Sequence, residues 1–261
     1  MNGNTDRARN AKPMTDMSPY LAPTAALDIE APAIVETVGR ITAGAADDVE
    51  RAICIHDFVR DSIPFGWVPH FDAETASQTL ASRIGFCNTK TPLFVALLRA
   101  AKIPARIHFV GINKHILGGM IDPIDEFVDH SYAEVYLNGT WLKLDSFIMD
   151  GPLFSVAMER LRASGRTIGF GVHINGKSTW DGKSDAFSQF LNDGTYENLT
   201  DVDFGIHEDV PAFYASGRAR TPRNFVFRNV ILRTLLHFGN RRVRALRDGA
   251  RAIAGPSASG Y

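Results

Sequence analysis

The sequence predicts an α+β protein in which helices from the first hundred residues pack on an antiparallel sheet from the middle of the chain. Apolar residues recur at helical spacing over much of residues 32–101. Segments 130–137 and 140–145 alternate cleanly between apolar and polar residues, as half-buried strands do. The dipeptide Asn138-Gly139 between them is the strongest short signal for a β-hairpin. Further helical patterns near the C-terminus complete this fold class.

Composition places the chain among ordinary globular proteins, with 261 residues, 45% hydrophobic and 22% charged. No run of 18 apolar residues occurs, so we expect no transmembrane helix. The basic N-terminus is not followed by the apolar core of a secretory signal. Two cysteines are too few for a disulfide framework, and a reduced cytoplasmic location is the simplest expectation.

The first half of the chain is expected to form four helices, over residues 32–42, 46–62, 73–83 and 87–101. Cys54 and His56 lie on the second helix, and we interpret both as packing residues. The aromatic segment 64–69 carries prolines at both ends and breaks the helical pattern.

A strand is expected at 103–110, followed by a long connection over 111–129 and the hairpin of 130–137 and 140–145. Helix returns at 152–163. Residues 164–205 are rich in Gly, Asn, Asp and Ser and are expected to form loops with short elements. Helices follow at 209–216, 225–238 and 241–253.

Cys87 follows the turn residue Gly85 closely and begins a helical apolar pattern. Unpaired N–H groups and the positive end of the helix dipole favour a thiolate at such a position. Because the thiolate is the nucleophilic form, we expect Cys87 to attack an acyl carbon.

The two strands of the hairpin place a histidine and a carboxylate at the same end of the ladder. His130 begins the first strand and Asp145 ends the second, so the two side chains can form a hydrogen bond. If the helix of Cys87 starts at this end, the three residues form a Cys–His–Asp triad. The carboxylate would orient the imidazole, and the imidazole would take and return the proton.

These segments together resemble the transglutaminase-like superfamily. The matching pieces lie in order within residues 47–147: Gly85-Phe86-Cys87, Ile103-Pro104-Ala105-Arg106, His130-Ser131-Tyr132-Ala133-Glu134-Val135 and Trp141-Leu142-Lys143-Leu144-Asp145. The resemblance implies a papain-like α+β fold, with Cys87 as nucleophile, His130 as base and Asp145 as the residue that orients it. Members of the family include protein crosslinkers, cysteine proteases, peptide:N-glycanases and proteins that have lost activity.

Further site candidates lie near these motifs. In this family a Trp, Gln or Asn side chain usually completes the oxyanion site, and the candidates here are Trp67, Gln78 and Asn88. The substrate-pocket candidates are Tyr132, Glu134 and Trp180; for Glu134 a salt bridge to Arg106 or Lys143 is the favoured alternative, and for Trp180 surface packing is an equal one. The remaining histidines lack metal-ligand spacing, so we expect neither a metal nor a cofactor.

The C-terminal region is strongly basic. Ten arginines and one acid lie between Arg218 and Arg251, a local charge of +9 that leaves about −10 for the rest of a chain whose net charge is −1. Seven of them could contact an anionic partner, such as a membrane surface, a carrier protein or nucleic acid: Arg218, Arg220, Arg223, Arg241, Arg242, Arg244 and Arg247. The favoured alternative is a helix that docks on the acidic body by its Phe225, Phe227, Ile231 and Leu235 face and leaves its basic side in solvent.

We therefore expect a cysteine-dependent enzyme that acts on a peptide, protein or small amide through an acyl-enzyme on Cys87, by hydrolysis or by transfer to an amine. The alternative is an inactive transglutaminase-like module that binds an anionic partner through the arginine-rich C-terminus. The expected organisation is a disordered or loosely packed segment 1–27, a catalytic domain 28–216, a basic helical segment 217–254 and a frayed tail 255–261.

Overall fold

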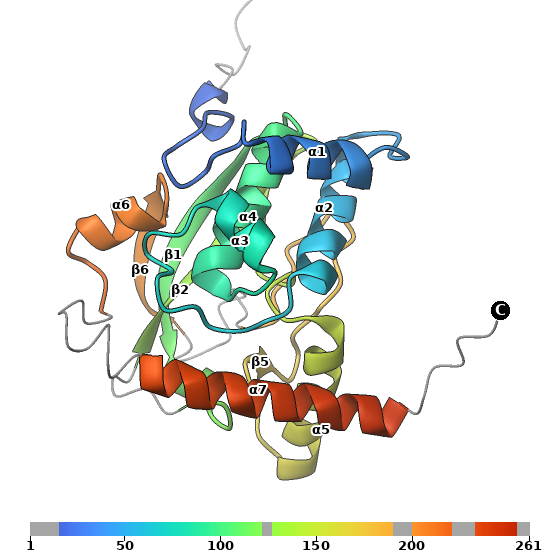
Figure 1. Cartoon of the computed structure of the whole chain (residues 1–261), viewed down its shortest axis with the longest axis vertical. Coiled ribbons are helices and arrows are strands. Elements are labelled where there is room, and N and C mark those ends of the chain that lie inside the picture. Colours follow the sequence, from blue (N-terminus) through green and yellow to red (C-terminus); the bar gives the residue numbers. More distant parts are fainter. Residues whose placement is uncertain (1–15, 122–126, 190–199, 221–232, 255–261) are drawn as a thin grey trace, which may run out of the picture.

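The computed structural model describes residues 16–121, 127–189, 200–220 and 233–254 (Figure 1). The α-helices are α1 (Pro32–Ile41), α2 (Asp48–Ser62), α3 (Ala76–Ser82), α4 (Cys87–Ala100), α5 (Gly151–Ser164), α6 (Val210–Ala215) and α7 (Arg233–Ala254). Two 3₁₀ turns are η1 (Ser18–Tyr20) and η2 (Lys114–Leu117). The strands are β1 (Ala105–Asn113), β2 (Phe127–Leu137), β3 (Thr140–Leu144), β4 (Ile168–Gly169), β5 (Val172–His173) and β6 (Thr200–His207).

The main sheet is antiparallel and has the strand order β3-β2-β1-β6. The expected hairpin joins β2 to β3, and Leu137 pairs with Thr140 across it. Asn138 and Gly139 have φ angles of 49° and 83°, the left-handed pair that a type I′ turn requires. The hairpin ladder ends at the pair Ala133 and Leu144, directly before Asp145.

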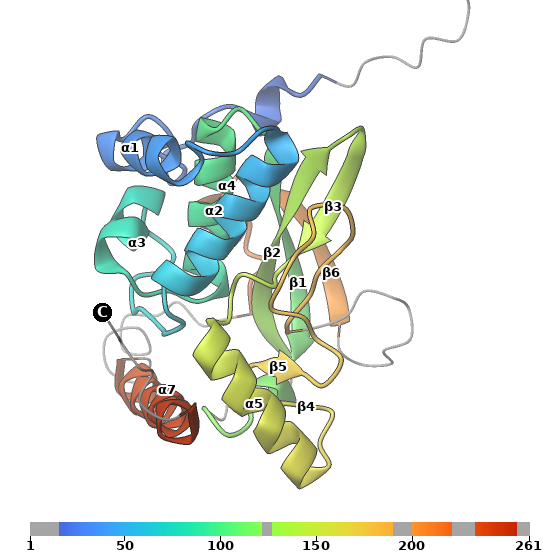
Figure 2. The same cartoon turned by 90° about the vertical axis from the view of Figure 1, so that its right-hand side faces the viewer.

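Helix α4 occupies the centre of the molecule, between the sheet on one side and α1, α2 and α3 on the other (Figure 2). Every residue from Cys87 to Arg99 is buried. Such complete burial explains why the apolar residues of α4 are not confined to one face, because a helix surrounded on all sides contacts protein all round. The nucleophile candidate thus begins a helix that is enclosed along almost its whole length.

The expected helices at the N-terminal end are confirmed, with bounds shifted by up to three residues. The main difference lies in β6, which the sequence analysis assigned to a region of loops. Its Val202 and Phe204 pack against the core and alternate with Asp203 and Gly205, the pattern of a strand with one packed side, whereas Ile206 is 44% exposed. The abundance of Asp and Gly concealed this signal. The first part of the helix expected at 225–238 lies outside the described residues, and its last six residues begin α7.

Residues 16–27 pack more closely than the sequence predicted. The hydroxyl of Thr24 donates to Asp209 at 2.7 Å, and Arg99 donates to the carbonyl oxygen of Ala22 at 2.7 Å. Leu27 is fully buried in the core. These contacts fix the described part of the N-terminal segment against α4 and the residues before α6.

Helix α7 packs beside α5 at the end of the molecule away from α1 (Figure 1). Leu236, Val243 and Leu246 are buried on its inner side, while Arg241 and Arg244 are exposed. The face that we expected to dock, formed by Phe225, Phe227, Ile231 and Leu235, lies outside the residues whose side chains the structure describes. No helix in the described part of the chain is long and apolar enough to cross a membrane.

Candidate active site

A tight turn at Gly85 sets the position of Cys87, the first residue of α4. The N–H of Gly85 donates to the carbonyl oxygen of Pro64 at 3.2 Å, and the N–H of Gly66 donates to the carbonyl oxygen of Gly85 at 2.9 Å. A Cβ atom at Gly85 would lie 2.6 Å from Thr89 Oγ1, so the turn has no room for a side chain. Thr89 Oγ1 also accepts the N–H of Phe86 at 3.1 Å, which closes the helix start.

Cys87, His130 and Asp145 lie together at one end of the sheet, and we call these three residues the Cys87 group. His130 Nε2 is 3.2 Å from Asp145 Oδ2, and the imidazole also hydrogen-bonds to the Cys87 side chain. The three residues are 9%, 1% and 0% exposed, respectively. The structure therefore brings together the three residues that the sequence singled out, in a site almost closed to water.

The environment of His130 favours its protonated form. Burial alone lowers the pKa of the imidazole, but hydrogen bonds to Asp145 and Cys87 and the electrostatic interactions with both residues raise the pKa to about 9. At neutral pH the imidazole is then a cation. A cation beside a cysteine favours the thiolate over the thiol.

Two residues that the sequence analysis missed hold the Asp145 carboxylate. The backbone N–H groups of Ser188 and Gln189 and the hydroxyl of Ser188 all donate to Asp145 Oδ1. Gln189 is fixed in turn, because its Nε2 donates to the carbonyl oxygen of Gly171 at 3.0 Å. With Oδ1 engaged in this way, Oδ2 is the oxygen directed at His130. Ser188 and Gln189 lie in an irregular segment without any motif, so no local signal could have identified them.

His56 anchors the residue after Asp145 from the opposite side. Its Nε2 lies 2.8 Å from Ser146 Oγ and its Nδ1 lies 2.9 Å from Asp57 Oδ1. Burial lowers the pKa of His56 by more than the Asp57 carboxylate raises it, so the ring is neutral and can accept the Ser146 hydroxyl proton. The interpretation of His56 as a packing residue is thus incomplete, because it also joins α2 to the end of β3.

The three oxyanion candidates have different surroundings. Asn88 follows Cys87 directly, and its Nδ2 donates to the hydroxyl of Tyr214 at 3.0 Å, while its buried Oδ1 has no hydrogen-bond partner in the described part of the chain. Trp67 is buried in the segment beside the Gly85 turn. Gln78 is exposed and caps the start of α3, where its Oε1 accepts the N–H of Thr75. Asn88 is the candidate adjacent to the nucleophile.

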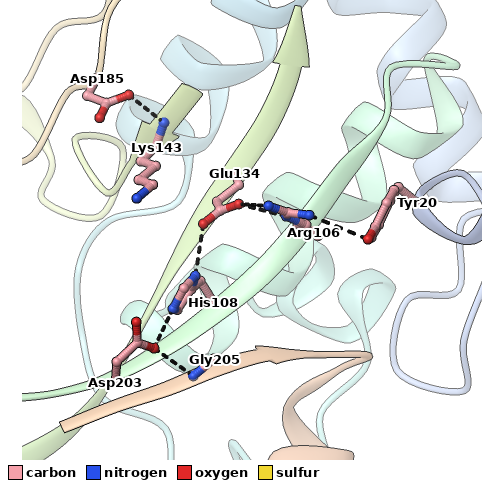
Figure 3. A network of polar contacts seen from close by, with 8 residues as sticks. All are labelled: Tyr20, Arg106, His108, Glu134, Lys143, Asp185, Asp203 and Gly205. Carbon is pink, nitrogen blue, oxygen red and sulfur yellow. Dashed lines mark hydrogen bonds and ion pairs between the residues drawn. The ribbon is translucent and has the colours of Figure 1, made fainter. Parts of the chain in front are cut away.

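Of the substrate-pocket candidates, Glu134 lies in a polar network on the sheet (Figure 3). Its carboxylate accepts from Arg106 Nε at 2.6 Å and lies 2.8 Å from His108 Nδ1. His108 Nε2 extends the network to Asp203 on β6, at 2.6 Å. Of the two salt bridges expected for Glu134, to Arg106 or to Lys143, the one to Arg106 is therefore present. Neither Arg106 nor His108 belongs to the Cys87 group.

The other two pocket candidates are buried. Tyr132 stacks on His108 with ring centroids 4.7 Å apart. Trp180 packs against His56 with ring centroids 5.8 Å apart, and its indole N–H donates to the carbonyl oxygen of Ser184 at 2.8 Å. Trp180 thus lies in the core, and neither its burial nor its contacts match the surface position that the loop sequence suggested.

A buried lysine lies one helical turn after Cys87. Lys90 Nζ donates to the carbonyl oxygen of Ile148 at 2.8 Å, and the side chain is fully buried. Burial lowers the pKa of Lys90 to about 7, although the nearby charges of Asp150 and Asp61 act in the opposite direction. Among the described residues, no three His, Cys, Asp or Glu side chains gather as metal ligands would.

Comparison with known proteins identifies one family. Residues 35–146 match the model of the transglutaminase-like superfamily. No curated protein matches the chain. Among solved structures, it is similar to a "putative cysteine protease" from Cytophaga hutchinsonii, with 20% identity over 49% of this chain and a TM-score of 0.41. It is also similar to a "putative protease" from Parabacteroides distasonis, with 13% identity over 46% of this chain and a TM-score of 0.32.

The shared region spans 41% and 25% of the length of these two solved proteins. The family match contains all three residues of the Cys87 group and the four motifs that carry the resemblance. Residues 35–146 of this chain thus match the family that the sequence resemblance implied.

Proposed function

We propose that the protein is a cysteine-dependent acyl-transfer enzyme that acts on an amide through an acyl-enzyme on Cys87. The observation that carries this proposal is the hydrogen-bonded series from Cys87 through His130 to Asp145, at the start of a buried helix. The raised pKa of His130 supports it, because a cationic imidazole can donate the proton that a leaving amine needs.

In the first half of the proposed reaction, the Cys87 sulfur attacks the amide carbonyl carbon. The carbonyl oxygen becomes an oxyanion, which first-turn N–H groups of α4 can stabilise. The C–N bond then breaks, and the departing amine takes the proton from His130. The products are the free amine and a thioester on Cys87.

In the second half, water or a primary amine attacks the thioester carbonyl. His130 removes the proton of the attacking molecule, and the Cys87 sulfur departs as the thiolate. Asp145, held by Ser188 and Gln189, keeps the imidazole oriented through both halves. The three residues are almost completely enclosed, and a site that stays this enclosed around the thioester would favour transfer to an amine over hydrolysis.

The test is to incubate the protein with peptide amides, with and without a primary amine, and to search for an acyl adduct by mass spectrometry. The wild-type protein should acquire the adduct on Cys87, and Cys87→Ala should acquire none. Cys54→Ala is the matched control, because Cys54 is the other cysteine of the chain and is half-buried on α2. Unchanged turnover in Cys87→Ala would remove Cys87 from the mechanism.

A second candidate is an inactive module that binds an anionic membrane surface. The observation that favours it is the outer side of α7, where Arg233, Arg241 and Arg244 are exposed together with Phe238, which is 57% exposed. Sedimentation with phosphatidylserine vesicles tests this candidate. Binding that is lost in the double variant Arg241→Glu, Arg244→Glu would support it, and equal binding by that variant would exclude it.

A further inference from the structure

The segment before the nucleophile turn is supported by a second stretch of backbone. Phe65 and Gly85 form a parallel bridge, with one hydrogen bond from Gly85 N–H to Pro64 and one from Gly66 N–H to Gly85. Cys87 begins α4 two residues after this bridge. The position of segment 64–67 therefore determines where the backbone that presents Cys87 can lie.

Helix α7 hydrogen-bonds to this segment through the side chain of Asn240. Asn240 Oδ1 accepts the N–H of Trp67 at 2.8 Å, and Asn240 Nδ2 donates to the carbonyl oxygen of Trp67 at 2.9 Å. One amide thus satisfies both backbone groups of one residue, as a neighbouring strand would. The preceding residue is Gly239, where a Cβ would lie 2.9 Å from Trp67 Cζ3, so the helix approaches as closely as only glycine allows.

A second contact between α7 and this segment lies two helical turns further on, at Arg247. Its Nη2 donates to the carbonyl oxygen of Phe65 at 3.0 Å and to Asp150 Oδ2 at 2.7 Å, while its Nε donates to Asp150 Oδ1 at 3.0 Å. Asp150 Oδ2 also accepts the N–H of Phe65 at 2.9 Å. The backbone of Phe65 is therefore held on both sides by the Arg247–Asp150 pair, which is largely buried.

We propose that α7 fixes the position of the nucleophile Cys87. Asn240 and Arg247 are positioning residues: they hold segment 64–67, which in turn holds the Gly85 turn before Cys87. This inference rests on the proposed role of Cys87. Its physical basis is that segment 64–67 is irregular backbone, whose place is set by its hydrogen-bond partners and not by a helix or sheet of its own. Small displacements of a nucleophile relative to its base have large effects on reactivity.

The mechanical part of the proposal is tested by hydrogen exchange at the amides of Gly66 and Gly85. Asn240→Ala removes both bonds to Trp67 and leaves the apolar side of α7 unchanged, so both amides should exchange about tenfold faster. Arg244→Ala is the matched control, because Arg244 is exposed on the same helix. Exchange at the wild-type rate in Asn240→Ala would show that Asn240 does not hold the Gly85 turn in place.

The chemical part is tested by alkylation of Cys87 with iodoacetamide at pH 7 and pH 10. The ratio of the two rates reports how much thiolate is present at neutral pH and cancels differences in access to the sulfur. Asn240→Ala should lower this ratio by about fivefold, with Arg244→Ala at the wild-type value. A wild-type ratio in Asn240→Ala would show that α7 does not act on the nucleophile.

Two further variants separate the contacts. Asn240→Asp keeps an acceptor for the Trp67 N–H and loses the donor to the Trp67 carbonyl, so the ratio should lie between wild type and Asn240→Ala. Arg247→Lys keeps the charge opposite Asp150 and loses the planar fork that also reaches Phe65, and should lower the ratio as well. If the ratio of alkylation rates in the wild-type protein equals that of a free thiol, the proposed function is contradicted. The hydrogen-exchange rates would still decide whether α7 holds the Gly85 turn in place.

Discussion

Ser188 hydrogen-bonds to Asp145 through both its backbone N–H and its hydroxyl, although the two residues lie 43 positions apart in the sequence. The hydroxyl reaches Asp145 Oδ1 at 3.1 Å and the carbonyl oxygen of Asp145 at 3.2 Å. This contact leaves Oδ2 of the carboxylate for His130. The orientation of the imidazole thus depends on a serine that touches neither the imidazole nor the nucleophile in these hydrogen bonds.

Ser188→Ala is expected to slow formation of the acyl adduct on Cys87 by about fivefold, because one of the donors that orient Asp145 is lost while the backbone donors stay. The rate of adduct formation, followed by mass spectrometry, measures the effect. Ser184→Ala is the control, since the Ser184 hydroxyl contacts the exposed Asp181 instead. Equal rates in both variants would show that the Ser188 hydroxyl is not needed for orientation.

His130→Gln is expected to slow alkylation of Cys87 by iodoacetamide about tenfold at pH 7. The variant removes the cation that favours the thiolate, and an ordinary cysteine is only a few per cent ionised at that pH. The comparison protein is His115→Gln, in which an exposed histidine is replaced in the same way. An alkylation rate in His130→Gln that equals that of wild type would contradict the pairing of Cys87 with His130.

Lys90→Met is expected to change how stability depends on pH. The pKa of Lys90 falls from an ordinary value of 10.5 to about 7 in the folded protein. Between these values the unfolded chain binds a proton that the native protein does not, so this group makes stability rise with pH. The free energy of unfolding of wild type should therefore increase relative to that of Lys90→Met from pH 7 to pH 10.

Urea unfolding at several pH values measures this difference. Lys177→Met serves as the control, because Lys177 is an exposed lysine. A constant difference between wild type and Lys90→Met over the whole range would mean that Lys90 stays protonated in the folded protein.

Glu134→Gln is expected to destabilise the fold by about 3 kcal/mol, since it leaves Arg106 and His108 facing a neutral group in a largely buried network (Figure 3). In the folded variant, Cys87 should still be alkylated at the wild-type rate. Thermal and urea unfolding give the stability change, with the exposed Glu159→Gln as reference. Slower alkylation with unchanged stability would instead indicate a role for Glu134 at the active site.

Local patterns were sufficient for the elements that carry the site. The start of α4 at Cys87 follows from the glycine turn and the apolar pattern after it, and the β2–β3 hairpin follows from Asn138-Gly139. Because the hairpin pairing is fixed by a two-residue turn, the sequence also places His130 and Asp145 at the same end of the ladder. The proximity of these two residues was therefore predictable, and the 3.2 Å contact agrees with it.

The sequence could not supply contacts made by segments without a pattern of their own. Ser188 and Gln189 reach Asp145, and Asn240 reaches Trp67, only because the chain folds back over long sequence distances, and nothing local to them indicates where they will lie. The same holds for Lys90 and Arg247, whose charges suggest a surface until the packing around α4 and α7 encloses them. The sequence by itself determined the helix start, the hairpin and the order of the three site residues, since these depend on short-range geometry. Tertiary packing alone decided how Asp145 is held, what braces the turn before Cys87 and how far each charge is buried, since these depend on which distant segments meet.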